Sequence, residues 1–400
     1  MRCRLVKIRF MGLSYFLLVN SILLFNLSVP IVASNFKGEG VHQFYLKKEL
    51  ISNTSDNKTL NMNIIRLYRV KGEPIILTHA AVTSNRAIYD LGEYLWNQGF
   101  DVWMPNMRSH GTPDQRSFVS PYSPGDYSFD SIVTEDWPFL LDYVYKETGK
   151  KVHIVGHSMG AMTWEQCLSG TSKDADGSLY VSDGLIKDRS SKVSSFTTIA
   201  MPPDLEEVRS VIKSLVYPLL PLLERFHIYV PFNVSASGKE RKLSSQLIRD
   251  SVVSLISPYI FFILPGGIIS PKNCSSEEFE DLVLKGLSAA HSDYTSDLIR
   301  WMYHKYKSRD GGVHYDENKR VEVPTLTITA SEDTLAPPNY IKKAMSRYPD
   351  STPIRLVHFI GAAHLDIILS KIVTKLGREI VDFYKNLELL GVREEKVVNL

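Results

Sequence analysis

The stretch KVHIVGHSMGAM, residues 151–162, places Ser158 between two glycines, where a strand-like run gives way to a helix-like one. Gly156, Ser158 and Gly160 fit the pattern G-x-S-x-G, whose three fixed positions chance alone can produce in a chain of this length. The context is more specific, because a strand that turns sharply into a helix exposes a serine hydroxyl above the edge of a sheet. This context predicts a nucleophile at Ser158 rather than an ordinary turn.

The residues around Ser158 have the types that such a turn requires. Glycine at positions 156 and 160 removes the Cβ atoms that would keep the helix away from its strand while Ser158 holds a strained backbone. The N–H of Met159 then lies at the helix N-terminus, where it can face negative charge that develops on a carbonyl oxygen. We therefore predict that Met159 supplies one donor of an oxyanion hole.

A serine nucleophile needs a base, and the base needs an acid that orients it. His364 follows the last strand-like run, in GAAHLD, and Asp333 follows the run before it, in ASEDTLAPP. Their order along the chain, serine then acid then histidine, is the one that this kind of fold uses. Because the carboxyl ends of parallel strands meet at one edge of a sheet, we predict that Ser158, Asp333 and His364 converge there as a catalytic triad.

The acid of this triad has alternatives in the sequence. Glu332 adjoins Asp333, and Asp204 lies just past the sixth strand-like run, where it could serve in a variant arrangement. His358 lies inside the last strand-like run, which favours a packing role for it over that of a base. Asp333 is the preferred acid.

Strand-like and helix-like runs alternate along the chain. This alternation predicts an α/β fold with a mainly parallel, eight-stranded sheet and helices on both faces. The first two runs have only a short link between them, which predicts an antiparallel hairpin at one edge. The eight predicted strands are 44–51, 62–70, 74–80, 101–107, 152–157, 194–201, 324–330 and 354–360, and the clearest helical patterns are 87–99, 136–149 and 370–387.

A long insertion separates the sixth and seventh predicted strands. Residues 203–322 are too many for an ordinary connection and have helical patterns of their own, so we predict a mainly helical cap between core segments 35–202 and 323–400. Two of its stretches, 215–232 and 257–271, are unusually apolar. They either bury against the core or each other, or form an apolar wall over a pocket for acyl chains.

Residues 1–34 carry the pattern of an export signal: basic residues, then a long apolar run, then small residues suited to cleavage. The apolar run is close to membrane-spanning length, so the segment is either a cleaved signal peptide or an uncleaved membrane anchor. In either case we expect the rest of the chain outside the cytosol, secreted, periplasmic, luminal or membrane-anchored.

Composition excludes several classes of protein. Four positive charges lie within the first nine residues, so the rest of the chain is nearly neutral and has no basic field for nucleic acid. Three cysteines in 400 residues exclude a disulfide scaffold, and whether Cys167 and Cys274 pair stays open. We expect no metal and no organic cofactor.

The stretches GFDVWMPNMRSHG, DWPFLLDYVYKETGKKVHIVGHSMGAM and SEDTLAPP resemble the α/β-hydrolase superfamily, in particular capped lipases and esterases of the acid-lipase and serine-aminopeptidase-like groups. The resemblance covers residues 62–202 and 323–387 and leaves out the predicted cap. It implies that THAAV supplies the second oxyanion donor, with His79 in the family's His-Gly pair and Ala81 as the donor. Ala80 stands where glycine is usual, and Ser109 stands where the family often has glycine.

These features together predict a serine hydrolase that cleaves carboxylic esters, with an apolar acyl group, through an acyl-enzyme on Ser158. The expected partner is a small-molecule or lipid ester, with membrane association through the N-terminal segment or the apolar cap. Two other functions stay open. The same triad serves amidases and peptidases, and a non-catalytic binding protein can retain the fold.

Overall fold

The computed structural model describes most of the chain after residue 37: 38–50, 58–112, 114–205, 217–227, 229–230, 268–270, 272–288, 290–391 and 393–400. All of these residues belong to one unit, Ser34–Leu400. The predicted export segment lies outside the described residues, as does most of the apolar stretch 257–271, whereas most of the stretch 215–232 is described. Within the described ranges, no helix combines the length and the apolar character needed to cross a bilayer.

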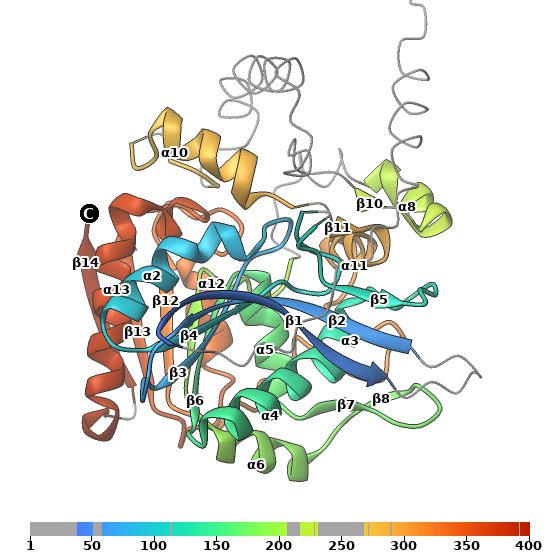
Figure 1. Ribbon diagram of the computed structural model, residues 1–400, viewed down its shortest axis with the longest axis horizontal. Helices are drawn as coiled ribbons and strands as arrows, with labels where there is room; N and C mark the ends of the chain where they lie inside the picture. Colours follow the sequence, from blue (N-terminus) through green and yellow to red (C-terminus); the bar gives the residue numbers. More distant parts are fainter. Residues whose placement is uncertain are drawn as a thin grey trace, which may run out of the picture. The chain divides into compact units, whose positions relative to one another are not determined.

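A ten-stranded sheet forms the centre of this unit (Figure 1). Its order is β1-β2-β4-β3-β6-β9-β12-β13-β14, and the short β5 pairs with β2. All eight predicted strands are present, and β5 and β14 are additions that the sequence pattern did not predict. The strands are β1 Gly40–Leu50, β2 Lys58–Tyr68, β3 Pro74–Thr78, β4 Asp101–Pro105, β5 Phe118–Ser120, β6 Val152–His157, β9 Val193–Ile199, β12 Thr325–Ala330, β13 Ile354–Ile360 and β14 Arg393–Asn399.

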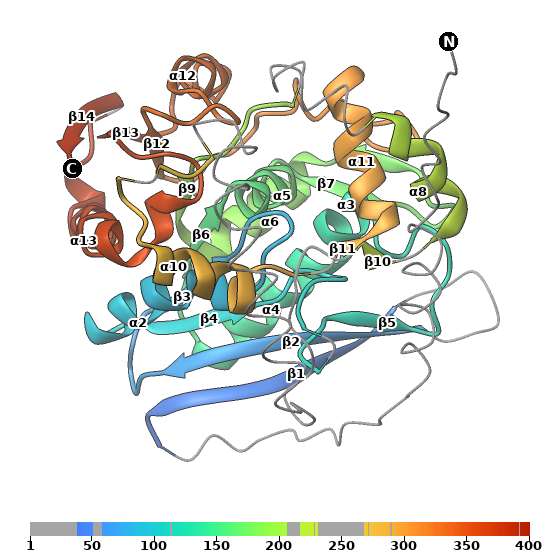
Figure 2. The same ribbon diagram turned by 90° about the horizontal axis from the view of Figure 1, so that it is seen from above.

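The direction of the strands divides the sheet in two. β1 and β2 form the predicted antiparallel hairpin, and β2 also pairs antiparallel with β4. From β4 to β14 every neighbouring pair is parallel. Figure 2 shows the hairpin at one edge of the sheet and β13 and β14 at the other. The parallel part therefore gathers the carboxyl ends of β3, β6, β12 and β13 at one edge.

Helices cover both faces of the sheet, as the alternation of runs predicts. One core cluster joins one face of the sheet to α4, α5 and α12, and a second joins the other face to α2 and α13. Helix α6 packs on the first side, against α4 and α5. The helices are α2 Tyr89–Asn97, α4 Trp137–Thr148, α5 Met159–Leu168, α6 Asp183–Lys192, α12 Pro338–Met345 and α13 Ser370–Lys385.

Local sequence explains where several of these helices begin and end. Pro138 stands in the first turn of α4, which continues directly from the helical residues Ile132–Asp136. Gly149 ends the same helix in the left-handed conformation, φ 65°, and its N–H donates to the carbonyl oxygen of Tyr145. The Ser182 hydroxyl caps α6 by accepting from the N–H of Leu185.

The predicted cap runs between β9 and β12, and the structure describes it in part. Most of the elements that are described there are helices. They are η3 Tyr217–Leu219, α8 Leu220–Phe226, β10 Tyr229–Val230, α10 Ser276–Asp281, η4 Leu282–Gly286, β11 Ala290–His291 and α11 Ser292–Tyr303. Helix α11 packs against α8, and β10 pairs with β11.

Short elements also occur outside the predicted cap. They are η1 Asn85–Ile88, α3 Phe129–Ser131, η2 Ile132–Asp136, β7 Thr171–Lys173, β8 Leu179–Val181, η5 Asp366–Ile368 and η6 Leu387–Leu389.

Candidate active site

The three side chains of the predicted triad lie together at the carboxyl edge of the sheet. Ser158 follows β6, Asp333 follows β12 and His364 follows β13. The Nε2 atom of His364 lies 2.8 Å from the Ser158 hydroxyl, and its Nδ1 atom lies 2.7 Å from a carboxylate oxygen of Asp333. All three residues are buried. Three segments far apart in the sequence thus form one continuous hydrogen-bonded chain.

Ser158 has the backbone strain that the nucleophile turn predicts. Its φ of 51° and ψ of −117° lie outside the regions that L-residues favour. Its N–H donates to the carbonyl oxygen of Ile199 at the end of β9, 2.8 Å away. This bond to a neighbouring strand fixes the turn between β6 and α5, which directs the hydroxyl toward His364.

The two glycines of the turn have no room for a side chain. A Cβ on Gly156 would lie 2.5 Å from the backbone nitrogen of Ala161, and one on Gly160 would lie 2.6 Å from the carbonyl oxygen of His79. Gly156 therefore brings α5 close to β6. Gly160 brings α5 close to the segment after β3, which carries the predicted second oxyanion donor.

The carboxylate that contacts His364 belongs to Asp333, the preferred acid, through its Oδ2 atom. Its other oxygen accepts hydrogen bonds from the N–H groups of Leu335 and Ala336, both 2.8 Å away. Glu332, the neighbouring alternative, is exposed. His358 lies within β13 and bonds to Thr329 and Glu395 instead.

The predicted second oxyanion donor, Ala81, lies in the turn after β3; we call residues 80–84 the oxyanion loop. Ala80 and Ala81 do not have positive φ, so the alanine at position 80 fits without the conformational freedom of glycine. The left-handed residue is instead Val82, with φ 54°. Such a φ is a strained conformation for a β-branched residue.

His79 fastens the oxyanion loop to the chain after β4. Its Nε2 atom accepts the N–H of Met107 at 3.0 Å, so its Nδ1 carries the proton and donates to the carbonyl oxygen of Ala80 at 2.8 Å. Burial, with a smaller effect from His110, holds the pKa of His79 well below its ordinary value. The lowered pKa favours the neutral ring, which is the form that makes both bonds.

His157 is a site residue whose role the sequence did not indicate. Its Nε2 atom donates to the carbonyl oxygen of His364, 2.9 Å away, and so links the end of β6 to the loop that carries the base. Burial and the neighbouring His364 lower the pKa of His157 to about 3. The sequence did mark Ser109, which stands where the family often has glycine. In the structure its φ is 73°, in the region that glycine favours.

This arrangement has the parts that acyl transfer requires. His364 is placed to take the proton of the Ser158 hydroxyl, and Asp333 holds the tautomer of the imidazole. Met159 is the first residue of α5, so its N–H has no acceptor within the helix and can meet an oxyanion. The close approach of Gly160 to His79 brings this donor next to the oxyanion loop.

Comparison with known proteins identifies the family. The sequence pattern of the Alpha/beta hydrolase family matches residues 75–368, from β3 to the end of the loop that carries His364. The chain belongs to this family. The matched range includes all three residues of the predicted triad and the whole of the predicted cap.

The relatives of this alpha/beta hydrolase include lipases. The chain is 30% identical over 125 residues to triacylglycerol lipase 2 of Arabidopsis thaliana, a match that spans 27% of this chain and 30% of that protein. It is 23% identical over 308 residues to human gastric triacylglycerol lipase, across 71% of each chain. A lysosomal acid lipase/cholesteryl ester hydrolase of Rattus norvegicus is 24% identical over 280 residues, across 65% of each.

Solved structures share the fold at low sequence identity. A thermophilic esterase from Thermogutta terrifontis superposes with a TM-score of 0.53 at 12% identity, over 86% of this chain and 99% of that chain. A putative epoxide hydrolase from Klebsiella pneumoniae gives a TM-score of 0.50 at 13% identity, over 85% and 97%. An esterase and an epoxide hydrolase perform different reactions, so this likeness establishes the fold alone.

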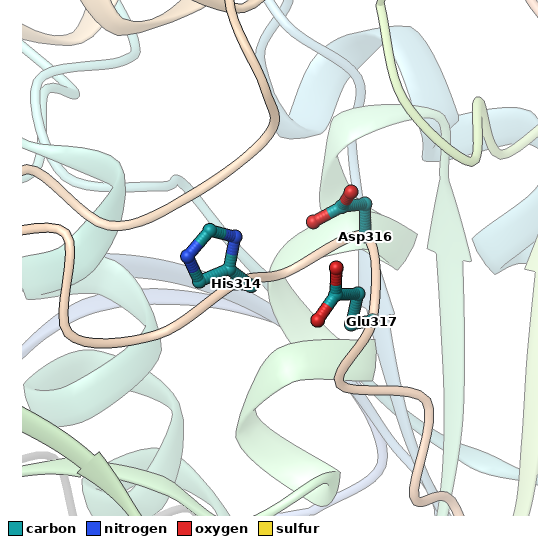
Figure 3. Close-up of side chains that lie close together, drawn as sticks. All are labelled: His314, Asp316 and Glu317. Carbon is teal, nitrogen blue, oxygen red and sulfur yellow. The ribbon is translucent and has the colours of Figure 1, made fainter.

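Three side chains of types that can bind metal ions lie close together in a turn that is separate from the triad. Among the residues that the structure describes, His314, Asp316 and Glu317 place ligand atoms within 4.8 Å of one another (Figure 3). The turn is partly exposed, and acidic groups are common at such positions without a cation. Cys167 and Cys274, whose pairing the sequence left open, are buried free thiols.

Proposed function

We propose that this alpha/beta hydrolase cleaves carboxylic esters with an apolar acyl group, through an acyl-enzyme on Ser158. His364 acts first as the base that takes the serine proton and then as the acid that releases the alcohol. Asp333 orients the imidazole, and the N–H groups of Met159 and Ala81 hold the oxyanion. Water activated by His364 then hydrolyses the acyl-enzyme.

The observation that carries this proposal is the hydrogen-bonded chain from Ser158 through His364 to Asp333, with distances of 2.8 and 2.7 Å. A binding protein that had lost catalysis would have no need to keep the hydroxyl, the imidazole and the carboxylate in contact at a buried site. The strained φ of Ser158 supports the same conclusion, because backbone strain persists where function uses it.

The substrate class is supported by the relatives and by the sequence of the predicted cap. Several relatives are named as triacylglycerol lipases, and one is named as an acid lipase that also hydrolyses cholesteryl esters. The two apolar stretches of the predicted cap suit acyl chains. We further propose that the chain is exported, since residues 1–34 have the pattern of a signal and the named relatives include gastric and lysosomal lipases.

Active-site labelling and a substrate series test this proposal. A fluorophosphonate probe should label the purified full chain but not its Ser158→Ala variant, whose hydrolysis of p-nitrophenyl esters should fall about a million-fold. The unfolding temperature should change little, because the variant removes one hydroxyl. Rates across p-nitrophenyl esters from acetate to palmitate should rise with chain length. A preference for aminoacyl anilides would replace the ester proposal with a peptidase.

A further inference from the structure

Three residues of the predicted cap lie antiparallel against the oxyanion loop; we call these residues, 286–288, the strap. Thr83 of the loop pairs with Leu287 of the strap. On one side of this pair the N–H of Ser288 donates to the carbonyl oxygen of Val82 at 2.8 Å. Thr83 and Ser288 are completely buried. A short antiparallel ladder thus joins the loop that carries Ala81 to a segment that lies about 200 residues later in the chain.

Further hydrogen bonds fix the strap on both of its sides. The N–H of Ser84 donates to the carbonyl oxygen of Gly286 at 2.8 Å, on the other side of the ladder. The Ser288 hydroxyl accepts the N–H of Gly111 at 2.6 Å, in the chain after β4. Just beyond the strap, the N–H of His291 donates to the Ser109 hydroxyl at 3.2 Å. The strap therefore lies between the oxyanion loop and the chain after β4 and is bonded to both.

The strap acts on the most strained residue of the oxyanion loop. Val82 has φ 54°, and its carbonyl oxygen is the group that accepts the Ser288 N–H. Thr83 closes the same turn from within, through its N–H and its hydroxyl on the Ala80 carbonyl oxygen, so the strap adds a second restraint against relaxation of Val82 toward a negative φ. Ala81 is the preceding residue, so a rotation at Val82 changes the geometry of the turn in which the Ala81 N–H is held.

We infer that the strap positions the second oxyanion donor, so that Val82 and Ser288 are positioning residues for acyl transfer. This inference rests on the proposed function. The strap tunes stabilisation of the tetrahedral intermediate rather than substrate binding, because an oxyanion donor acts where charge develops. The predicted cap therefore contributes to the chemical step as well as covering the site.

The Val82→Gly variant shows whether the strap only stabilises the fold or also positions the oxyanion donor, because the two roles predict different values of kcat. Glycine adopts positive φ without strain, so this variant should unfold at the same or a higher temperature than the parent. If the strain serves to hold the donor, kcat for p-nitrophenyl butyrate should nevertheless fall about tenfold with KM unchanged, because the loop becomes free to move. Lys71→Gly is the matched control. Lys71 is exposed, has φ 60° and lies in the turn between β2 and β3, so its variant should keep the parental kcat.

The Ser288 side chain gives an independent test. Ser288→Ala removes the acceptor of the Gly111 N–H, whereas Ser288→Thr keeps it, so kcat should fall about tenfold in the first variant and recover in the second. Inhibition by an alkyl trifluoromethyl ketone, which forms a tetrahedral oxyanion on serine, reports the donor directly. The inhibition constants of Val82→Gly and Ser288→Ala should rise in parallel with the loss of kcat.

The outcomes separate this inference from the proposed function. If the parent chain hydrolyses esters and both variants keep its kcat and its inhibition constant, the strap has no positioning role while the proposed function stands. A fall in unfolding temperature that accounts for the loss of activity, with parental kcat per folded molecule, contradicts the inference in the same way. If the parent neither hydrolyses esters nor binds the ketone, both the proposed function and the inference are wrong.

Discussion

The nucleophile turn and the oxyanion loop meet at the same edge of the sheet, and each contains a non-glycine residue with positive φ. Ser158 has φ 51° and Val82 has φ 54°. The first lies between Gly156 and Gly160, which allow α5 to approach, and its N–H donates to the carbonyl oxygen of Ile199 on a neighbouring strand. The second lies in a turn that Thr83 closes on the Ala80 carbonyl oxygen, and its own carbonyl oxygen accepts the N–H of Ser288. Each strained residue thus combines local contacts with one bond to another segment, and for Val82 that segment belongs to the predicted cap.

Gly160→Ala should have the largest effect of the changes that follow, because Gly160 belongs to the turn and touches the loop. Its Cβ would lie 2.6 Å from the carbonyl oxygen of His79 and 2.7 Å from the Thr78 hydroxyl, so one of the two regions must shift. We expect kcat to fall about a hundredfold and unfolding to become easier by roughly 1–3 kcal/mol. Steady-state kinetics and urea denaturation measure the two effects.

The control for this change is Gly184→Ala, in α6. A Cβ there would lie 3.6 Å from its only near neighbour, the Ser182 hydroxyl, and φ is not positive. Since alanine is the better helix former, this variant should be about 1 kcal/mol more stable with unchanged kcat. Parental kcat in Gly160→Ala would show that the turn and the loop do not depend on each other's position.

His79→Phe tests the loop alone and should have a smaller effect on activity. It leaves the Met107 N–H without its acceptor and removes one donor from the Ala80 carbonyl oxygen, which still accepts from Thr83; this should cost roughly 1–3 kcal/mol of unfolding free energy and lower kcat about tenfold. His153→Phe is the matched control: His153 is equally buried and bonds to Ser195, away from the triad. A similar loss of kcat in both variants would argue that general destabilisation is the cause.

The acid sensitivity of the two regions should give the smallest effect. His157 beside the turn has its pKa lowered to about 3, chiefly by burial, while an unfolded histidine titrates near 6.5. The unfolded state therefore binds the extra proton between these values, so stability is complete above about pH 6.5 and is lost as pH falls toward 3.

Replacing this histidine should flatten the acid dependence. Between pH 7 and pH 5 the parent should lose about 2 kcal/mol more unfolding free energy than His157→Gln. Urea denaturation at the two pH values measures the difference, with His304→Gln as a control at an exposed position. Equal losses in parent and His157→Gln would mean that the ring is not held neutral. The unfolding free energy of His157→Gln should still fall somewhat in acid, because His79 in the oxyanion loop is also buried and has a lowered pKa.

The sequence predicted most strands of the sheet, because the apolar patterns that mark a strand lie within the strand itself. β6 and β13 have the predicted bounds, and the helices α2, α4 and α13 lie within the predicted patterns. β14 was missed because its residues are mostly exposed and charged, so it has no apolar periodicity to detect. It is placed by pairing with β13 through the backbone and by bonds between charged side chains, such as His358 with Glu395, which no apolar pattern marks.

At the site, the sequence by itself determined the residues whose chemistry depends on order and spacing. It indicated Ser158 through its glycines, and His364 and Asp333 through their positions after successive strands. The sequence preferred Asp333 but left its neighbour Glu332 open, because it does not show which of two adjacent side chains in a loop faces the histidine; the contact between Asp333 and His364 belongs to the tertiary structure. The same holds for His157, whose partner is a carbonyl oxygen that no sequence pattern marks. The strap depends on tertiary structure most of all, since the bridge between Thr83 and Leu287 joins residues about 200 positions apart and exists only once the two segments lie side by side.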